Sequence, residues 1–164
     1  MPEPPRNPRP TGPAPHTPRP PLRQTLRAVP ASALAAVAIG GAIGATARYG
    51  LTTALPSAPG SFNYATFLAN TTGGLLIGAL MVIVTEAAPG TTLARPFLGV
   101  GVLGGFTTFS TYLLDIGHAA NADATLLAVL YAFTTLAAAL LTAALGMYAT
   151  RRLLKRGRRD SETT

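Results

Sequence analysis

Four long apolar runs constrain this chain more than any other feature of its sequence. They cover residues 31–55, 62–87, 92–118 and 124–150, and short polar or Pro- and Gly-containing segments separate them. A helix rises about 1.5 Å per residue and the hydrocarbon core of a membrane is about 30 Å thick, so each run is long enough to cross it. Only 12% of the residues are charged and the mean hydropathy is +0.34. We therefore predict an all-α membrane protein with four transmembrane helices.

The composition outside these runs divides the chain into three parts. Residues 1–30 are rich in proline and arginine and hold almost nothing apolar to bury, which predicts a disordered tail. Residues 31–150 form the predicted four-span domain, and residues 151–164 form a second basic tail. The first run follows arginines as a secretory signal does, but it is longer than such a signal and Arg48 interrupts it, which favours a retained span. The chain has no cysteine, which excludes disulfides and thiol chemistry.

The basic residues lie on one side of the predicted bundle. Five of the 13 Lys and Arg residues precede residue 28 and six follow residue 150, whereas only Arg48 and Arg95 lie between. Four spans place both termini on the same side, and the loop that holds Arg95 falls there too. The positive-inside rule makes this side cytoplasmic. We predict a multi-pass membrane protein with both termini in the cytoplasm, and no nucleic-acid partner.

Residues 99–112, with the sequence GVGVLGGFTTFSTY, are the most unusual part of the third run. Each glycine weakens a helix by roughly 1 kcal/mol relative to alanine. Non-helical backbone persists at membrane depth only where protein or water satisfies it. We therefore predict that the third helix is broken mid-membrane, near Gly104 and Gly105, and lines an ion path. The carbonyls freed by the break need a partner, and a bound cation is one solution.

Polar and aromatic side chains follow these glycines closely. The hydroxyls belong to Thr107, Thr108, Ser110 and Thr111, and the rings belong to Phe106, Phe109 and Tyr112. Some hydroxyls are expected to bond back to their own helix, and the others to line the path. The rings repeat every three residues, which fits either ordinary packing or a row of electropositive ring edges facing an anion.

Small residues at helical spacing mark the first two runs. Gly40 and Gly44 form a small-xxx-small motif, which lets another backbone approach closely. In the second run, Thr66 and Asn70 lie four residues apart. Gly74 and Gly78 continue the same helical face at that spacing.

Three further polar positions each allow two interpretations. Arg48 lies toward the end of the first run, where it either snorkels to the interface or draws anions to a pore mouth. Asn70 either holds two helices together or donates to an anion along a polar track. Asp115 and His118 fit a solvated helix end better than a metal pair.

Three motifs resemble the signatures of one family, the CrcB/Fluc fluoride channels. They are GGAIGATARY at residues 40–49, TFLANTTG at 66–73 and GGFTTFSTY at 104–112. They occur in the family's order, in the first three of four spans, and the resemblance covers residues 34–150. It implies a passive fluoride-selective channel, built as an antiparallel dimer of the dual-topology type with two pores and a central sodium ion.

The resemblance also implies roles for individual residues. Arg48 corresponds to a vestibule residue, Asn70 to the polar track, and Phe109 to a ring beside the permeating anion. The fluoride pathway implied in full is Arg48, Thr66, Asn70, Phe106, Thr108, Phe109, Ser110, Thr111, Tyr112, Tyr131 and Thr135. The backbone carbonyls of Gly104 and Thr107 correspond to the Na⁺ ligands. Two positions depart from the family pattern, because Tyr112 replaces the usual second phenylalanine and Ala139 replaces an expected hydroxyl.

The charge distribution bears on the partner. A subunit that inserts both ways should carry little charge bias in its loops, yet this chain has a strong one. The family also contains paired subunits that insert oppositely. We therefore hypothesise that the partner is an oppositely oriented paralogue rather than a second copy.

Two other functions remain as alternatives to a channel. A small four-span cation or drug exporter needs a buried carboxylate in the first span, where this chain has none. A non-conducting scaffold subunit is the third possibility. No ATP motif or catalytic set of nucleophile and base is visible, so an enzyme has no residues to support it.

Overall fold

The computed structural model describes residues 30–58, 60–88 and 90–162, with side chains described up to Gly157. The predicted disordered tail therefore lies outside the described residues, apart from Pro30. The described part is helical, and its elements are α2 (Ala31–Ala54), α3 (Tyr64–Val82), the π-helix η1 (Ile83–Ala87), the π-helix η2 (Arg95–Leu103), α4 (Gly104–Phe106), α5 (Ser110–Asn121) and α6 (Thr125–Glu162).

Four candidate membrane spans emerge from these elements, which confirms the predicted all-α, four-span class. By length and composition they are Ala31–Ala54, Tyr64–Ala87, Arg95–Asn121 and Thr125–Gly157. The bounds differ most at the end of the chain, because α6 continues through the basic residues beyond 150. The apolar run ends there, but Leu, Lys and Arg are good helix formers and cations are favourable at a helix C-terminus.

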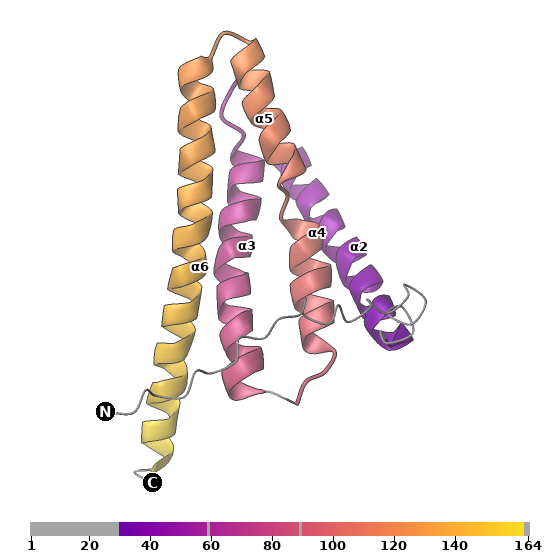
Figure 1. The fold of residues 1–164 in the computed structure, drawn as a ribbon, viewed down its shortest axis with the longest axis vertical. Helices are drawn as coiled ribbons and strands as arrows, with labels where there is room; N and C mark the ends of the chain where they lie inside the picture. Colours follow the sequence, from indigo (N-terminus) through magenta and orange to yellow (C-terminus); the bar gives the residue numbers. More distant parts are fainter. Residues whose placement is uncertain (1–29, 59, 89, 163–164) are drawn as a thin grey trace, which may run out of the picture.

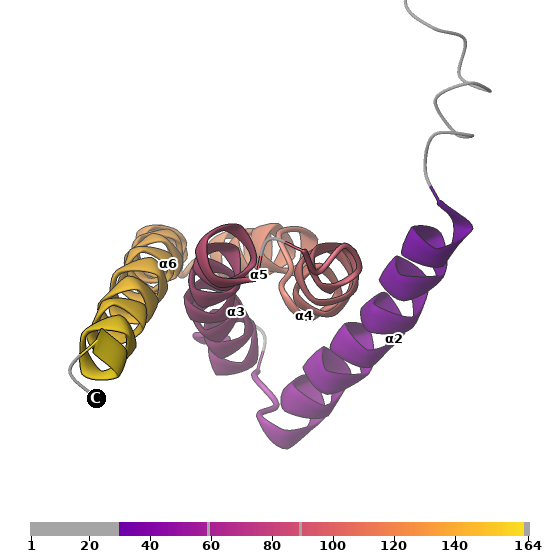
Figure 2. The same ribbon diagram turned by 90° about the horizontal axis from the view of Figure 1, so that it is seen from below.

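The four spans run up and down beside one another in an open row (Figure 1). Seen from below, α6 lies at one end, α3 follows, the third span comes next, and α2 lies at the other end (Figure 2). In agreement with this order, α3 packs mainly on α6, whereas α2 packs mainly on η2 and α4. The two end helices therefore do not close the bundle.

Glycines make the contact between α2 and the third span very close. A Cβ atom at Gly40 would meet the main chain of Phe97 and Gly101, and one at Gly44 would meet the carbonyl of Val102. On the other side, Gly105 faces the backbone of Gly41. The predicted close approach at the small-xxx-small motif is therefore confirmed.

The second-run glycines serve a different contact. Cβ atoms at Gly74 and Gly78 would meet the carbonyls of Ala139 and Ala143 on α6. Small residues let α3 and α6 approach closely, as in other membrane helix pairs.

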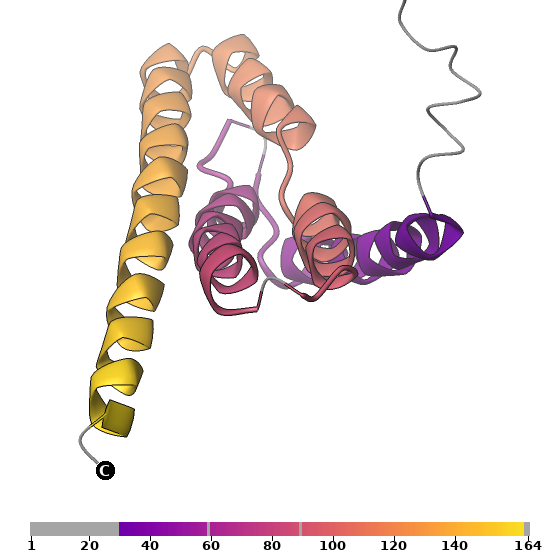
Figure 3. The ribbon, with the colours of Figure 1, turned by 60° about the horizontal axis from the view of Figure 1, so that its bottom comes forward.

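The third span is interrupted between α4 and α5 (Figure 3). α4 ends at Phe106, the backbone of Thr107 is extended (φ −76°, ψ 158°), and α5 begins at Ser110. Gly104 and Gly105, where the sequence placed the weak point, are both helical. Gly105 is used instead for close packing on α2, so the interruption falls just after the glycine pair.

Candidate functional site

A groove of about 370 Å³ lies beside the interruption, between α3, the third span and α6. Seven of the residues singled out from the sequence line it: Asn70, Gly104, Thr107, Thr108, Phe109, Tyr112 and Thr135. The rest of its wall is apolar or glycine, and Ala139 is part of it. The other sequence-predicted residues lie away from this groove, namely Arg48, Thr66, Phe106, Ser110, Thr111 and Tyr131.

Asn70 joins α3 to the interruption through two hydrogen bonds. Its Nδ2 donates to the carbonyl oxygen of Thr108 (2.9 Å), and the N–H of Thr108 donates to its Oδ1 (2.8 Å). The side chain thus satisfies both peptide groups that the interruption deprives of helical partners. An amide nitrogen carries two N–H groups, so one donor remains beyond this pairing. Both sequence interpretations of Asn70 are compatible with this geometry.

The threonines at the interruption hold its two helix ends. Thr107 Oγ1 donates to the carbonyl of Leu103 (2.9 Å), at the end of the first half of the span. Thr108 Oγ1 accepts from the N–H of Thr111 (3.2 Å) and lies 3.0 Å from Thr111 Oγ1. Thr108 therefore satisfies one N–H group in the first turn of α5. Ser110 is exposed and lies 3.4 Å from the Thr108 hydroxyl.

Arg48 reaches the same region from α2. Its Nε donates to the carbonyl oxygen of Gly105 at 3.2 Å, and the side chain is partly buried. A cation is favourable at the C-terminal end of a helix, where carbonyl groups lack partners. Arg48 therefore supplies a positive charge at the end of α4.

The aromatic rings form a connected series from the interruption to Phe62, just before the start of α3. Phe109 lies 5.8 Å from Tyr112, and Tyr112 lies 5.8 Å from Tyr131, between ring centroids. Phe62 then contacts Tyr131 edge-on at 4.9 Å. Phe109 is 70% exposed, whereas Tyr112 is 8% exposed. Phe106 lies near Gly73 and is partly buried.

The extra hydroxyl of Tyr112 has a partner within the chain. It donates to the carbonyl oxygen of Ala132 on α6 at 2.7 Å. The hydroxyl therefore tethers α5 to α6, and the ring remains part of the groove wall.

Thr66 and Thr135 carry buried hydroxyls at the α3–α6 contact. Each side chain is 2% exposed. Within the part of the chain that the structure describes, neither Oγ1 atom has a hydrogen-bond partner. Unpaired buried hydroxyls are costly, and of these two residues only Thr135 lines the groove.

Asp115 has a role that the sequence did not reveal. It accepts a hydrogen bond from Asn63 Nδ2 (3.1 Å) and another from the hydroxyl of Tyr131 (3.0 Å). Asn63 also caps α3 by accepting from the N–H of Thr66 (3.1 Å). The carboxylate thus connects α3, α5 and α6, which is more than a solvated helix end. Its spacing to His118 gave no signal of this, because the partners come from other helices.

The fold and this site define a four-span helical membrane protein with a largely apolar groove, which carries a few polar groups, beside an interrupted helix. The chain belongs to the CrcB-like family, because the family model described as CrcB-like protein, Camphor Resistance (CrcB), matches residues 35–147. This confirms the resemblance seen in the sequence motifs.

Curated relatives agree with the family assignment. The chain is 49% identical to "Fluoride-specific ion channel FluC 2" of Nocardia farcinica over 118 residues, which is 72% of this chain and 84% of that protein. It is 45% identical to "Fluoride-specific ion channel FluC 1" of Streptomyces coelicolor over 126 residues, which is 76% and 81%. It is also 45% identical to "Fluoride-specific ion channel FluC 2" of Thermobifida fusca over 130 residues, which is 79% and 96%.

Proposed function

We propose that this protein is a fluoride-selective passive channel that exports cytoplasmic fluoride and so lowers its toxicity. The observation that carries the proposal is the groove itself. It brings Asn70, Thr108, Phe109 and Tyr112 together in a chain that is 45–49% identical to proteins named fluoride-specific ion channels.

The groove offers the chemistry that such a pathway needs. Fluoride is small and strongly hydrated, so the protein must replace its water with hydrogen-bond donors. The second N–H of Asn70 and the hydroxyl of Thr135 are neutral donors in the groove, the hydroxyl of Thr66 is a buried donor outside its lining, and the ring edges of Phe109 and Tyr112 are electropositive. Neutral groups allow the ion to leave as well as to enter. Arg48 supplies positive charge near the interruption without lining the groove.

The remaining residues of the proposed pathway lie around the interruption and beyond Tyr112. Phe106 and Thr107 form the first rim of the interruption, and Ser110 and Thr111 form the second. Tyr131 extends the aromatic series beyond Tyr112. We assign them to the pathway, with Arg48 as a positive charge beside the interruption.

The interruption at residues 107–109 is proposed to lie at mid-membrane, with Na⁺ bound there. Among the hydrogen bonds of the described residues, none reaches the carbonyl oxygen of Gly104 or that of Thr107. Such oxygens suit a hard cation. Bound sodium would supply a fixed positive charge between the two half-helices. The Arg48 guanidinium occupies the neighbouring carbonyl of Gly105, which leaves these two for the ion.

The channel is proposed to be an antiparallel dimer. The groove is open, and the 70% exposed Phe109 at its edge has no covering helix in the described chain. Both termini are proposed to be cytoplasmic, which fixes the orientation of this subunit. The partner is therefore proposed to be a paralogue of opposite orientation. Streptomyces avermitilis, for example, has relatives named FluC 2 and FluC 3.

Efflux from liposomes tests the function. The protein is expressed alone and together with an oppositely oriented paralogue, reconstituted into vesicles loaded with potassium fluoride, and followed with a fluoride electrode after valinomycin is added. We expect rapid fluoride efflux, no chloride efflux, and activity only in the co-expressed sample. Full activity from the single chain refutes the paralogue partner but keeps the channel. Absence of fluoride efflux from both samples rejects the channel and favours a cation exporter or a scaffold subunit.

A further inference from the structure

The end of α6 forms a basic face outside the predicted membrane core. At about 1.5 Å per residue, the 38 residues of α6 extend well beyond a hydrocarbon core of about 30 Å. The apolar run ends at Thr150, and the cationic residues Arg151, Arg152, Lys155 and Arg156 follow. We call residues 151–157 the basic end of α6.

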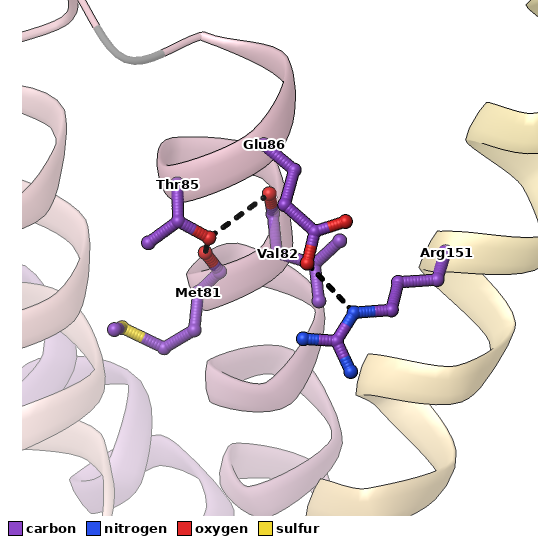
Figure 4. Close-up of polar contacts among 5 residues, drawn as sticks. All are labelled: Met81, Val82, Thr85, Glu86 and Arg151. Carbon is purple, nitrogen blue, oxygen red and sulfur yellow. Dashed lines mark hydrogen bonds and ion pairs between the residues drawn. The ribbon is translucent and has the colours of Figure 1, made fainter.

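An ion pair fastens the basic end to the second span. Arg151 Nε donates to Glu86 Oε1 at 2.7 Å, and Figure 4 shows the two side chains meeting between η1 and α6. The hydroxyl of the neighbouring Thr85 donates to the carbonyl oxygen of Met81 (2.6 Å). Glu86 neutralises Arg151 and links the start of the basic end to η1.

Three cations remain on one face of this helix. Arg152 and Arg156 are four residues apart, and Lys155 lies between them in the adjacent row. Like charges at this spacing repel one another, so an anionic partner between them stabilises the helix. Glu86 cannot serve them, because it is already paired with Arg151.

The position of Tyr148 indicates that this basic face lies near the membrane surface. Arg152 lies over the ring of Tyr148, with Cζ 4.9 Å from the ring centroid, and Tyr148 is 57% exposed. Exposed tyrosines are typical of the membrane–water interface. The cations that follow Tyr148 therefore lie at the depth of lipid headgroups.

An apolar groove adjoins Lys155, one of these three cations. It has a volume of about 420 Å³, and Ala87, Leu153, Leu154 and Gly157 line it together with Glu86, Arg151 and Lys155. Leu153 is 66% exposed. A ligand that fits both parts carries a negative headgroup and an apolar portion, which a free anion does not.

We propose that the basic end of α6 binds anionic phospholipids, with the headgroup phosphate at Arg152, Lys155 and Arg156 and the apolar part along Leu153 and Leu154. The Glu86–Arg151 pair positions this face. Binding here anchors one end of the bundle to the anionic leaflet, independently of ion conduction.

Thermal unfolding in detergent tests the proposal with the full chain. Phosphatidylglycerol, phosphatidylcholine and inorganic phosphate are titrated separately against the wild type, a triple variant (Arg152→Gln, Lys155→Gln, Arg156→Gln) and the matched control Arg95→Gln, which removes an exposed cation from η2. Each cation near an anionic surface contributes about 1 kcal/mol, so the triple variant should bind phosphatidylglycerol at least about tenfold more weakly.

The expected result is that phosphatidylglycerol raises the unfolding temperature of the wild type and of Arg95→Gln, while the other two ligands do not. The single variant Arg156→Gln, expected to lose about fivefold in affinity, replaces the triple variant if that protein does not fold. Equal stabilisation of the wild type and the basic-end variants by phosphatidylglycerol overturns the proposal, as does stabilisation of the wild type by inorganic phosphate to the same extent.

Discussion

Asn70 and Thr108 are joined by a reciprocal pair of hydrogen bonds, at 2.9 and 2.8 Å, between a side-chain amide and a main-chain peptide. The two residues are 38 positions apart and belong to different spans. The amide replaces helical partners for a peptide that has left the helix. The shape of the interrupted span therefore depends on a residue of α3. A substitution at Asn70 is expected to alter both the geometry of the groove and the stability of the fold.

Replacing Asn70 should change both stability and conduction. Asn70→Ala removes both hydrogen bonds and should lower the free energy of unfolding by about 1–3 kcal/mol, with loss of fluoride efflux. Asn70→Asp keeps the acceptor but removes every N–H donor and adds negative charge, so efflux should also be lost. Thermal unfolding in detergent and liposome efflux measure the two properties. Normal efflux from Asn70→Asp would show that Asn70 does not donate to the ion.

Arg48 is expected to act by charge at the end of α4. Arg48→Met leaves the Gly105 carbonyl without its donor and removes the positive charge, so fluoride efflux should fall at least about tenfold. Arg48→Lys keeps the charge but not the fixed geometry of the guanidinium, and should retain intermediate activity. Initial efflux rates at equal protein density check this order. If Arg48→Met matches the wild type, the residue only snorkels to the interface.

Tyr112→Phe tests the departure from the family pattern. The substitution keeps the ring in the groove and removes the hydrogen bond to Ala132. The Ala132 carbonyl lies within α6, where a backbone N–H is available, so no buried group is left unpaired. We expect a loss of about 1 kcal/mol in stability and fluoride efflux within about twofold of the wild type. Tyr112→Leu, which removes the ring edge, should abolish efflux. A large loss in Tyr112→Phe would instead assign the hydroxyl to the pathway.

Because α2 packs closely on the third span, alanine substitutions at two nearby glycines of α2 should differ in their effect on the free energy of unfolding. A Cβ at Gly44 would meet the Val102 carbonyl and lie 2.8 Å from the Phe106 nitrogen, whereas one at Gly41 meets nothing within 4 Å. Gly44→Ala should therefore destabilise the protein by about 1–3 kcal/mol, and Gly41→Ala should be neutral or slightly stabilising. Thermal unfolding of the two variants side by side provides the measurement. Equal unfolding temperatures would contradict this packing.

The sequence by itself determined the four-span helical class and the family, because apolar length and local motifs are properties of single segments. It also identified Asn70, Thr108, Phe109 and Tyr112 as candidate site residues, and all four line the groove. It predicted the close contact at Gly40 and Gly44, since small residues at helical spacing have a direct steric meaning.

Only the tertiary structure decided which atoms meet. Arg48 bonds to a carbonyl 57 residues away, Tyr112 reaches α6, and Asp115 collects donors from two other helices. It also assigned Gly105 to packing on α2 and placed the interruption after it. Helical periodicity acts within one span, whereas these contacts depend on the register and spacing of spans that pack against one another. That relative placement is set by the close glycine and alanine contacts of the whole bundle, which no single segment encodes.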